Sequence, residues 1–345
     1  MKMKFDICAL PILAAFSLSA SVLTAAAGDA KVQVTADNFV RAESDTYIGN
    51  LAKAAGGLAK LVHHREPAAI DDHSVIRLNR DTLYSYAVFD LDAGPVTFNL
   101  PDPGSRFMSL MAVSQDHYAT TVYGPGAHSF DKETIGTRYV MIGTRILVDP
   151  NDKKDIAQVH GLQDAIKISQ EGSGALDLPR WDTASLKKVH DAVLVLASTV
   201  SNFDRAFGTK AEVDPIRHLI GAAAGWGGNP DKDARYLNVT PAKNDGKTIY
   251  KLTVKDVPVD GFWSVSVYDA QGFYDKNPYN AYSLNNVTAA KSADGSITVQ
   301  FGGCDGRIVN CLPTGKDWNY TVRLYRPRAA ILDGTWTFPS PEPAG

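Results

Sequence analysis

The chain has 345 residues, a formal net charge of −3 at pH 7 and 44% hydrophobic residues. This length is more than one hydrophobic core usually serves, so we expect two domains. Positive and negative side chains are interspersed, without the basic patch that nucleic-acid binding requires, so we expect no nucleic-acid partner.

The N-terminus has the pattern of a secretory signal peptide. Lys2 and Lys4 precede an apolar run over residues 7–23, and three alanines follow at 25–27. The run is short for a membrane span and ends in small residues suited to cleavage. We therefore expect cleavage near Ala27 and a periplasmic or secreted protein. No later segment is long and apolar enough to cross a bilayer.

A helix and then a series of strands are predicted for the first part of the mature chain. Apolar residues recur at three- and four-residue intervals over residues 37–62, which indicates a helix. From residue 74 to about 148, short strand-like runs such as 95–100 and 137–142 alternate with Pro, Gly and Asp turns. This succession is typical of a β-sandwich with a helix packed beside it.

Two helices are predicted in the connecting region that follows. Asp182 is placed to cap a helix whose apolar stripe continues from Leu186 to Phe207. An Asp-Pro pair at 214–215 opens a shorter helix that ends at Gly225.

Strands return from residue 235 to the end of the chain. They are predicted at 248–254, 261–268, 296–301 and 318–325. In the second of these, Trp263, Val265 and Val267 alternate with Ser264 and Ser266, which indicates one buried face.

Cys304 and Cys311 are the cysteines that remain after the expected cleavage, and the segment between them resembles a turn. In an oxidising compartment we expect them to form a disulfide. A metal site is the alternative, but it would need more ligands, and no histidine follows His218. The chain also has no His-Glu-x-x-His spacing, no Gly-x-Ser-x-Gly motif and no phosphate-cradling loop. We therefore expect neither a metal nor another cofactor.

Two blocks of motifs carry a family resemblance. The first block contains Asn38-Phe-Val-Arg-Ala-Glu-Ser-Asp-Thr-Tyr47, Arg65-Glu-Pro67, Asn79-Arg-Asp-Thr-Leu-Tyr84 and Gln115-Asp-His-Tyr118. It resembles the bacterial domain of unknown function 1254. The second block contains Ala223-Ala-Gly-Trp-Gly-Gly-Asn-Pro230, Tyr268-Asp-Ala-Gln-Gly-Phe273 and Leu332-Asp-Gly-Thr-Trp336. It resembles the usual partner of the first, domain of unknown function 1214.

The resemblance covers nearly all of the mature chain and implies a fold but little about activity. It implies an immunoglobulin-like β-sandwich followed by a jelly-roll-type β-sandwich, so we predict a mainly β protein with helical inserts. The expected divisions are an N-terminal domain at 28–150, a helical connecting region at 151–234 and a C-terminal domain at 235–345. Sandwiches host many unrelated functions, so function depends on the site.

The hexapeptide at 79–84 places three strongly polar side chains inside a strand-like stretch. Arg80 and Asp81 are adjacent, so on a regular strand they point to opposite faces and do not simply pair with each other. In a structural interpretation Asp81 braces a loop, and Arg80 pairs with a carboxylate such as Glu43 or Asp45. In a functional interpretation Arg80 binds a carboxylate or phosphate of a ligand.

A second polar group, Gln115-Asp-His-Tyr118, follows an apolar run and is expected where a strand leaves its sheet. His117 is a candidate general base or metal ligand, with Asp116 orienting a neighbouring group. The alternative is a histidine with satisfied hydrogen bonds at an interface. The functional interpretation gains if His117 meets Arg80 or Asp81 in space.

Three hypotheses about function remain open. The leading one is a protein that binds a small organic or carbohydrate-like ligand in a polar cleft with an aromatic rim. A second is a periplasmic hydrolase with Asp81 or His117 as general base, and a third is a structural envelope module in which the same residues lock the two domains. The candidate ligand-binding residues are Asn79, Arg80, Asp81, Tyr84, His117 and Tyr118.

Overall fold

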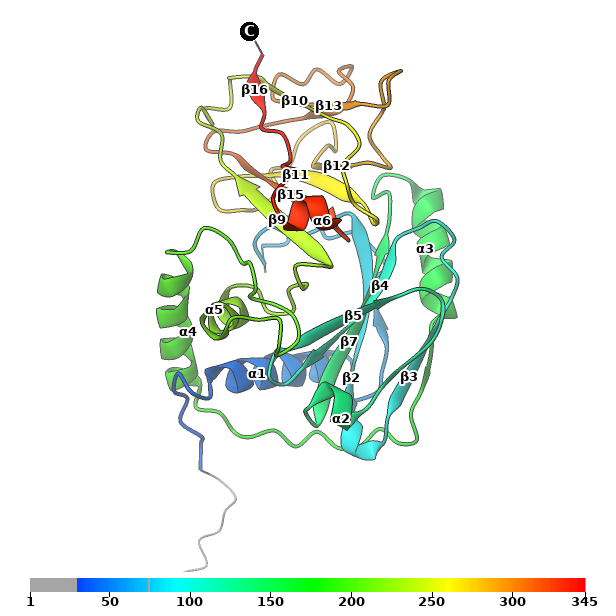
Figure 1. The fold of residues 1–345 in the computed structure, drawn as a ribbon, viewed down its shortest axis with the longest axis vertical. Helices are drawn as coiled ribbons and strands as arrows, with labels where there is room; N and C mark the ends of the chain where they lie inside the picture. Colours follow the sequence, from blue (N-terminus) through cyan, green and yellow to red (C-terminus); the bar gives the residue numbers. More distant parts are fainter. Residues whose placement is uncertain (1–29, 74, 345) are drawn as a thin grey trace, which may run out of the picture.

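The computed structural model describes residues 30–73 and 75–344, so the expected signal peptide lies outside the described residues. Within these ranges the chain forms sixteen β-strands in four sheets together with six α-helices (Figure 1). The mainly β prediction is confirmed. The immunoglobulin-like and jelly-roll topologies and the expected domain boundaries stay predictions.

The first half is organised around a five-stranded antiparallel sheet of order β1-β2-β7-β4-β5, and a smaller sheet has the order β6-β3-β8. In the larger sheet Tyr84 of β2 lies opposite Arg145 of β7. The strands are β1 (Val62–His63), β2 (Thr82–Asp90), β3 (Val96–Leu100), β4 (Met108–Ser114), β5 (Ala119–Tyr123), β6 (Gly126–Phe130), β7 (Tyr139–Leu147) and β8 (Lys167–Ser169). The short helices η1 (Leu91–Ala93) and α2 (Lys132–Ile135) lie in the connections.

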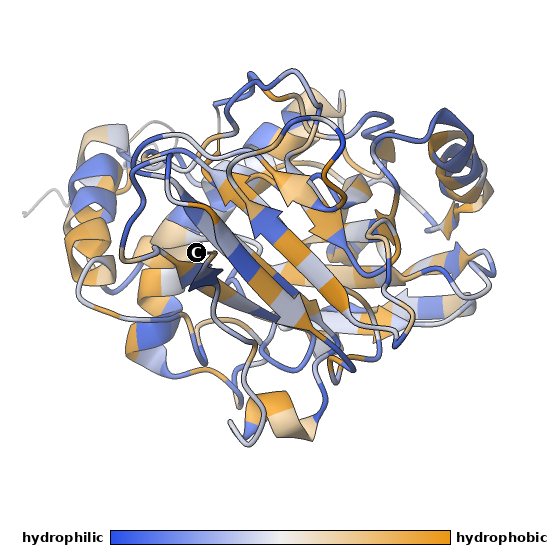
Figure 2. Cartoon of the chain, turned by 90° about the horizontal axis from the view of Figure 1, so that it is seen from above, coloured by the Kyte–Doolittle hydropathy of each residue, from blue (hydrophilic) through white to orange (hydrophobic). Residues whose placement is uncertain are grey.

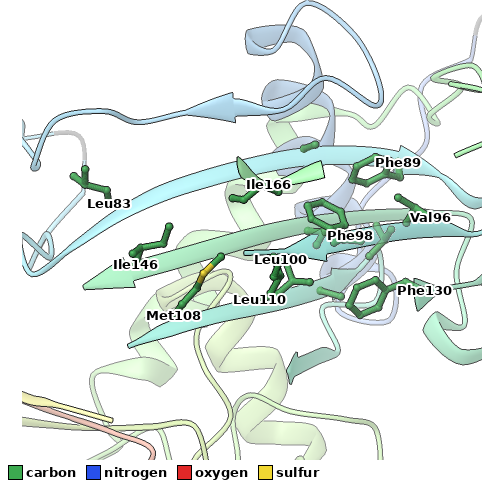
Figure 3. Close-up of a cluster of buried hydrophobic side chains, with 14 of the residues drawn as sticks. Leu83, Phe89, Val96, Phe98, Leu100, Met108, Leu110, Phe130, Ile146 and Ile166 are labelled. Carbon is green, nitrogen blue, oxygen red and sulfur yellow. The ribbon is translucent and has the colours of Figure 1, made fainter. Parts of the chain in front are cut away.

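The main core of this half lies between the two sheets. Phe89 of β2 and Phe98 of β3 are fully buried, with ring centroids 5.6 Å apart (Figure 3). Helix α3 (Lys153–Ala165) adds Val159 to the same core. Burying a side chain of the size of phenylalanine stabilises the fold by about 1.5–3 kcal/mol. This core therefore fixes the larger sheet as the rigid element that carries the polar residues described below.

The opposite face of the larger sheet is covered in part by α1 (Phe39–Ala54), whose Ile48 packs against Val88. The predicted helix over 37–62 is too long at its C-terminal end. Gly56 and Gly57 have φ angles of 74° and 137°, which are outside the helical range and which glycine adopts without steric cost. They end the helix eight residues earlier than expected.

Helices α4 (Thr183–Ala197) and α5 (Pro215–Ala224) pack beside α1. Asp182 and Asp214 cap them as predicted, since each carboxylate accepts from backbone N–H groups of the first turn. The expected stripe to Phe207 does not lie on one helix, because α4 ends at Ala197. The Ser198 and Thr199 hydroxyls donate to carbonyls three residues earlier and so compete with helix propagation.

The second half consists of two four-stranded sheets of order β14-β13-β10-β16 and β12-β11-β15-β9 that share one core. Val265 of β11 and Val322 of β15 pack in it with Val299 and Phe301 of β13. Figure 2 shows hydrophobic and hydrophilic residues alternating along strands of this half. The strands are β9 (Ala234–Val239), β10 (Tyr250–Val254), β11 (Trp263–Tyr268), β12 (Ser283–Asn285), β13 (Ile297–Phe301), β14 (Cys311–Leu312), β15 (Asn319–Tyr325) and β16 (Glu342–Pro343). Helix α6 (Ala329–Leu332) follows β15.

The expectation of one buried face for β11 is wrong. Trp263 lies in the core, as predicted, but Ser264 and Ser266 on the other face are also fully buried. The reason is tertiary: Arg323 of β15 donates to the Ser266 hydroxyl and to the backbone of the segment before β2. The first half of the chain therefore covers this face of the second.

Cys304 and Cys311 form the predicted disulfide, with Cα atoms 5.7 Å apart. Among residues 30–73 and 75–344, no helix combines the length and the apolar run that crossing a bilayer requires.

Candidate functional site

The segment that leads into β2 lies at the junction of the two halves. Asn79 donates from Nδ2 to the Tyr84 hydroxyl over 3.2 Å and to the Tyr325 hydroxyl over 3.0 Å. Its Oδ1 accepts from the Asp81 backbone N–H over 2.9 Å. One amide side chain thus shapes the entry into β2 and joins it to β15.

Arg80 is buried and does not pair with Glu43 or Asp45, which are both engaged by side chains of other elements. That proposed pairing is wrong. The Arg80 guanidinium donates to the Ala68 carbonyl and lies 5.6 Å from the centre of the Tyr282 ring. Burial lowers its pKa, because desolvation disfavours the charged form. Arg80 therefore links a loop of the first half to an aromatic residue of the second.

Asp81 is fully buried against the second half. Its Oδ1 accepts from the Asn285 amide over 3.2 Å and from the Ser283 hydroxyl over 3.4 Å, both in β12. Its Oδ2 has no hydrogen-bond partner among the described residues. Burial raises the pKa of this carboxyl, and the nearby Arg323 charge opposes the rise. A general base must reach a substrate or water, whereas this carboxylate is enclosed by protein, which favours the bracing role.

The second half also holds the backbone before Asn79. Arg323 donates from its guanidinium to the Arg77 carbonyl over 2.7 Å. The Tyr268 and Tyr274 hydroxyls donate to the Leu78 carbonyl over 2.8 and 2.7 Å. Hydrogen bonds to buried carbonyls are costly to break without replacement. The segment from 77 to 81 therefore acts as a brace between the two halves.

His117 lies elsewhere, in a buried aromatic group beneath α5. Its φ is 62°, and its Nε2 accepts from the Gly227 backbone N–H over 2.9 Å. The His117 ring stacks on His218 and Trp226 with centroids 5.4 and 5.8 Å apart, and Tyr118 stacks on His218 at 4.8 Å. Burial, with a smaller effect of His218, lowers the pKa of His117 to about 3.

The candidate residues thus fall into two groups. Asn79, Arg80, Asp81 and Tyr84 meet at the junction, and His117 stacks with residues of the connecting region. Within residues 30–73 and 75–344, no hydrogen bond, ion pair or ring contact joins His117 to Arg80 or Asp81. Among the same residues, no three His, Cys, Asp or Glu side chains converge as metal ligands.

Arg145 is one of several polar residues at this junction that lie outside the motifs, as Arg323 and Asn285 also do. It lies opposite Tyr84 on β7, and its guanidinium carbon is 5.8 Å from the centre of the Tyr84 ring. It donates to Asn229 Oδ1 over 2.5 Å and to the Gly227 carbonyl over 3.3 Å. An arginine inside a largely apolar strand, Tyr139–Leu147, was the signal that could have identified it.

A pocket of about 140 Å³ lies between the chain that follows α4 and strand β9. Its wall combines aromatic rings with side chains that donate and accept hydrogen bonds. Arg235 pairs with Asp204 over 2.8 Å and with Asp231 over 3.4 Å, and the Asn229 amide donates to the Tyr236 hydroxyl over 2.6 Å. The polar and aromatic lining residues are Ser201, Asn202, Phe203, Asp204, Phe207, Asn229, Asp231, Arg235, Tyr236 and Asn238.

Comparison with known families agrees with the motifs. Residues 58–129 match the model of the family described as protein of unknown function DUF1254, and residues 236–329 match that of DUF1214. The chain carries a DUF1254 region followed by a DUF1214 region. The Asn79 contacts therefore join the DUF1254 region to the DUF1214 region at Tyr325. Arg145 and Asn229 lie in the chain between the two matched ranges.

Similarity to one solved structure supports the fold alone. The VPA0106 protein from Vibrio parahaemolyticus superimposes with a TM-score of 0.68 at 16% identity, over 90% of this chain and 98% of that one. A putative uncharacterized protein from Burkholderia cenocepacia has a TM-score of 0.49 at 13% identity, over 84% and 85% of the two chains. No curated protein matches the sequence.

Proposed function

We propose that the protein binds a small carbohydrate-like ligand in the pocket between the connecting region and β9. The observation that carries the proposal is the composition of the pocket wall, in which aromatic rings stand beside carboxylate, amide and guanidinium groups. A sugar presents hydroxyls that both donate and accept and an apolar ring face, so it requires this combination of neighbours.

The polar groups of the pocket are suited to hydrogen bonds with the hydroxyls of a ligand rather than to binding a single strong charge. Arg235 is already neutralised by two carboxylates, Asp204 and Asp231. The side-chain oxygen Oδ1 of Asn238 accepts from the Thr321 hydroxyl over 2.8 Å, which orients the Asn238 amide group. A neutral polyhydroxylated ligand fits such a wall better than an anion does, because two carboxylates face the one guanidinium.

The aromatic groups supply the apolar surface. Tyr236 is 36% exposed and lines the pocket with Phe203 and Phe207. Pockets for drug-sized ligands measure roughly 300–1,000 Å³, so one of about 140 Å³ matches a ligand no larger than a single sugar ring. The further rings of a longer saccharide would have to project from the pocket.

The brace at residues 77–81 supports this function indirectly. Strand β9 belongs to the second half, whereas the connecting region packs on the first half through α1. Asn79 and Asp81 fix the two halves relative to each other. In this role they shape the pocket without touching the ligand.

Titration calorimetry and saturation-transfer NMR with a panel of pentoses, hexoses and polyols test the proposal. We expect at least one sugar to bind and the substitution Asn238→Ala to weaken it about tenfold, as loss of a hydrogen bond worth ~1.4 kcal/mol would. Asn99→Ala is the matched control, because Asn99 is exposed on β3. Absence of binding across the panel, or equal affinity in Asn238→Ala and the native protein, would contradict the proposal.

A further inference from the structure

We infer that Arg145 and the tyrosines around it form a second binding site, which takes the carboxylate group of a small organic acid. The Tyr84 ring centre lies 5.8 Å from the Arg145 guanidinium carbon. The Asn229 side chain connects Arg145 to the Tyr236 hydroxyl. The Asn79 amide connects the Tyr84 hydroxyl to that of Tyr325. We call the side chains of Arg145, Tyr84, Tyr236 and Tyr325 the Arg145 cluster. It lies at the junction of the two halves.

The first reason is the charge of Arg145. Among the described residues, no carboxylate lies within ion-pair distance of its guanidinium. Its hydrogen-bond acceptors are the Asn229 amide oxygen, the Gly227 carbonyl and, at 3.8 Å, the Met111 sulfur. These contacts use three donors of the five that a guanidinium carries. A cation that is enclosed by protein without an anionic partner is stabilised when an anion binds beside it.

The second reason is an excess of hydrogen-bond donors. The Asn79 amide donates to the Tyr84 and Tyr325 hydroxyl oxygens, and the Asn229 amide donates to that of Tyr236. Each phenol oxygen is thus occupied as an acceptor, which leaves its own O–H proton free to donate. A ligand at this place meets donors and few acceptors. That surrounding suits an oxyanion and disfavours a cation or a neutral amine.

The third reason is access. Arg145 and Tyr84 are half-buried rather than buried, although both lie on inner strands of the five-stranded sheet. Gly143, two residues before Arg145 and on the same face of β7, is also reached by solvent. Part of the surface of Arg145, Tyr84 and Gly143 is therefore accessible, although the Arg145 guanidinium itself is deeply enclosed by protein.

The chemistry of the cluster favours a carboxylate. A guanidinium binds a carboxylate through two parallel N–H···O bonds, and hydroxyl donors complete the shell of its oxygens. The single unit of charge on Arg145 balances a monoanion, whereas a phosphate carries about two negative charges at neutral pH.

This site borders the sugar pocket and shares the Tyr236 side chain with it. Asn229 and Tyr236 line that pocket, whereas Arg145, Tyr84 and Tyr325 do not. The Asn229 side chain stands between the two places, with its oxygen on Arg145 and its nitrogen on Tyr236. The two tests remain separable, because Asn238 belongs to the sugar pocket and not to the Arg145 cluster, whereas Arg145 and Tyr84 lie outside the pocket wall.

Calorimetry with benzoate and its uncharged counterpart benzamide tests the inference on the native protein. We expect benzoate to bind and benzamide to bind at least tenfold more weakly. Arg145→Gln should weaken benzoate binding by tenfold or more, and Tyr84→Phe, which keeps the ring and removes one donor, should weaken it severalfold. Tyr86→Phe is the matched control, since Tyr86 lies on the same strand and face but not in the cluster.

The two variants also guard against a loss of folding. If Arg145→Gln does not fold, Tyr84→Phe decides the question, with thermal unfolding to confirm that the variant is native. Benzamide binding as tightly as benzoate would overturn the inference, and so would benzoate affinity that Tyr84→Phe leaves unchanged. Inorganic phosphate binding more tightly than benzoate would overturn the carboxylate assignment.

Discussion

The Asn79 amide nitrogen lies 3.0 Å from the Tyr325 hydroxyl oxygen, and this contact joins the start of β2 to the end of β15 across 246 positions of the chain. The same nitrogen reaches the Tyr84 hydroxyl, which lies in the first half. A single side chain is therefore shared by the entry into β2, the Arg145 cluster and the second half.

Substitution of Asn79 by alanine is expected to destabilise the protein by about 1–3 kcal/mol, because the Asp81 N–H and two phenols lose a partner in a poorly solvated place. Urea unfolding followed by circular dichroism measures the change. Asn99→Ala removes an exposed amide from β3 and should stay within about 0.5 kcal/mol of the native protein. Equal stabilities of the two variants would contradict the role assigned to Asn79.

The pH dependence of stability should change in Asp81→Asn. Burial raises the pKa of Asp81 above its ordinary value of 3.8, so the folded state holds this proton more tightly than the unfolded state does. The native protein therefore loses stability relative to the variant as pH rises from 3.8 through the folded-state pKa. Unfolding free energies of both proteins between pH 3 and 8 give the difference directly. A difference that does not vary with pH would show that the Asp81 pKa is not raised.

His117 is expected to remain neutral in the folded protein far below the usual range of histidine. Its pKa is lowered from 6.5 to about 3, so the unfolded state takes up a proton first as the solution is acidified. The native protein should lose stability relative to His117→Gln as pH falls from 6.5 towards 3. The glutamine oxygen is able to accept from the Gly227 N–H in place of the imidazole, which keeps that contact.

Nitrogen-15 NMR gives an independent test on the native protein. Because Nε2 accepts from Gly227, the proton of the neutral His117 ring should reside on Nδ1. A ring that titrates near 6.5, or one that carries its proton on Nε2, would contradict this arrangement.

The Cys304–Cys311 disulfide closes a small loop, so the double substitution Cys304→Ser and Cys311→Ser should destabilise the protein by roughly 2–3 kcal/mol on the chain-entropy model. Chemical denaturation with and without a reducing agent measures this effect. The native protein should respond to the reductant and the double variant should not. If the reducing agent changes the stability of the native protein and of the double variant equally, the disulfide does not contribute the expected stabilisation.

Local signals in the sequence were sufficient for several elements of the fold. Asp182 and Asp214 were correctly predicted as helix caps, because a carboxylate at an N-cap bonds to N–H groups two or three residues away. The end of α1 at Ala54 was missed, although two glycines follow it. Two local signals conflict at this boundary. The apolar pattern continues to residue 62, whereas the two glycines adopt positive φ angles that end the helix.

The candidate residues stay predictions as a ligand site. The structure joins Asn79 to Tyr84 by a hydrogen bond, and the guanidinium beside the Tyr84 ring is that of Arg145, which no motif contained. Pairing register between β2 and β7 decides which side chain of β7 lies beside Tyr84. That register depends on the packing of whole strands, which no short motif encodes.

The sequence by itself determined the mainly β character, the motif blocks, the helix caps and the pairing of Cys304 with Cys311, because each depends on residues that are near one another in the chain. The tertiary structure alone decided that Ser264 and Ser266 are buried, that Asp81 faces β12, and that His117 lies away from both Arg80 and Asp81. These outcomes depend on how the two halves dock. Docking depends on contacts between residues up to 246 positions apart, whose energies become defined only when both surfaces have formed.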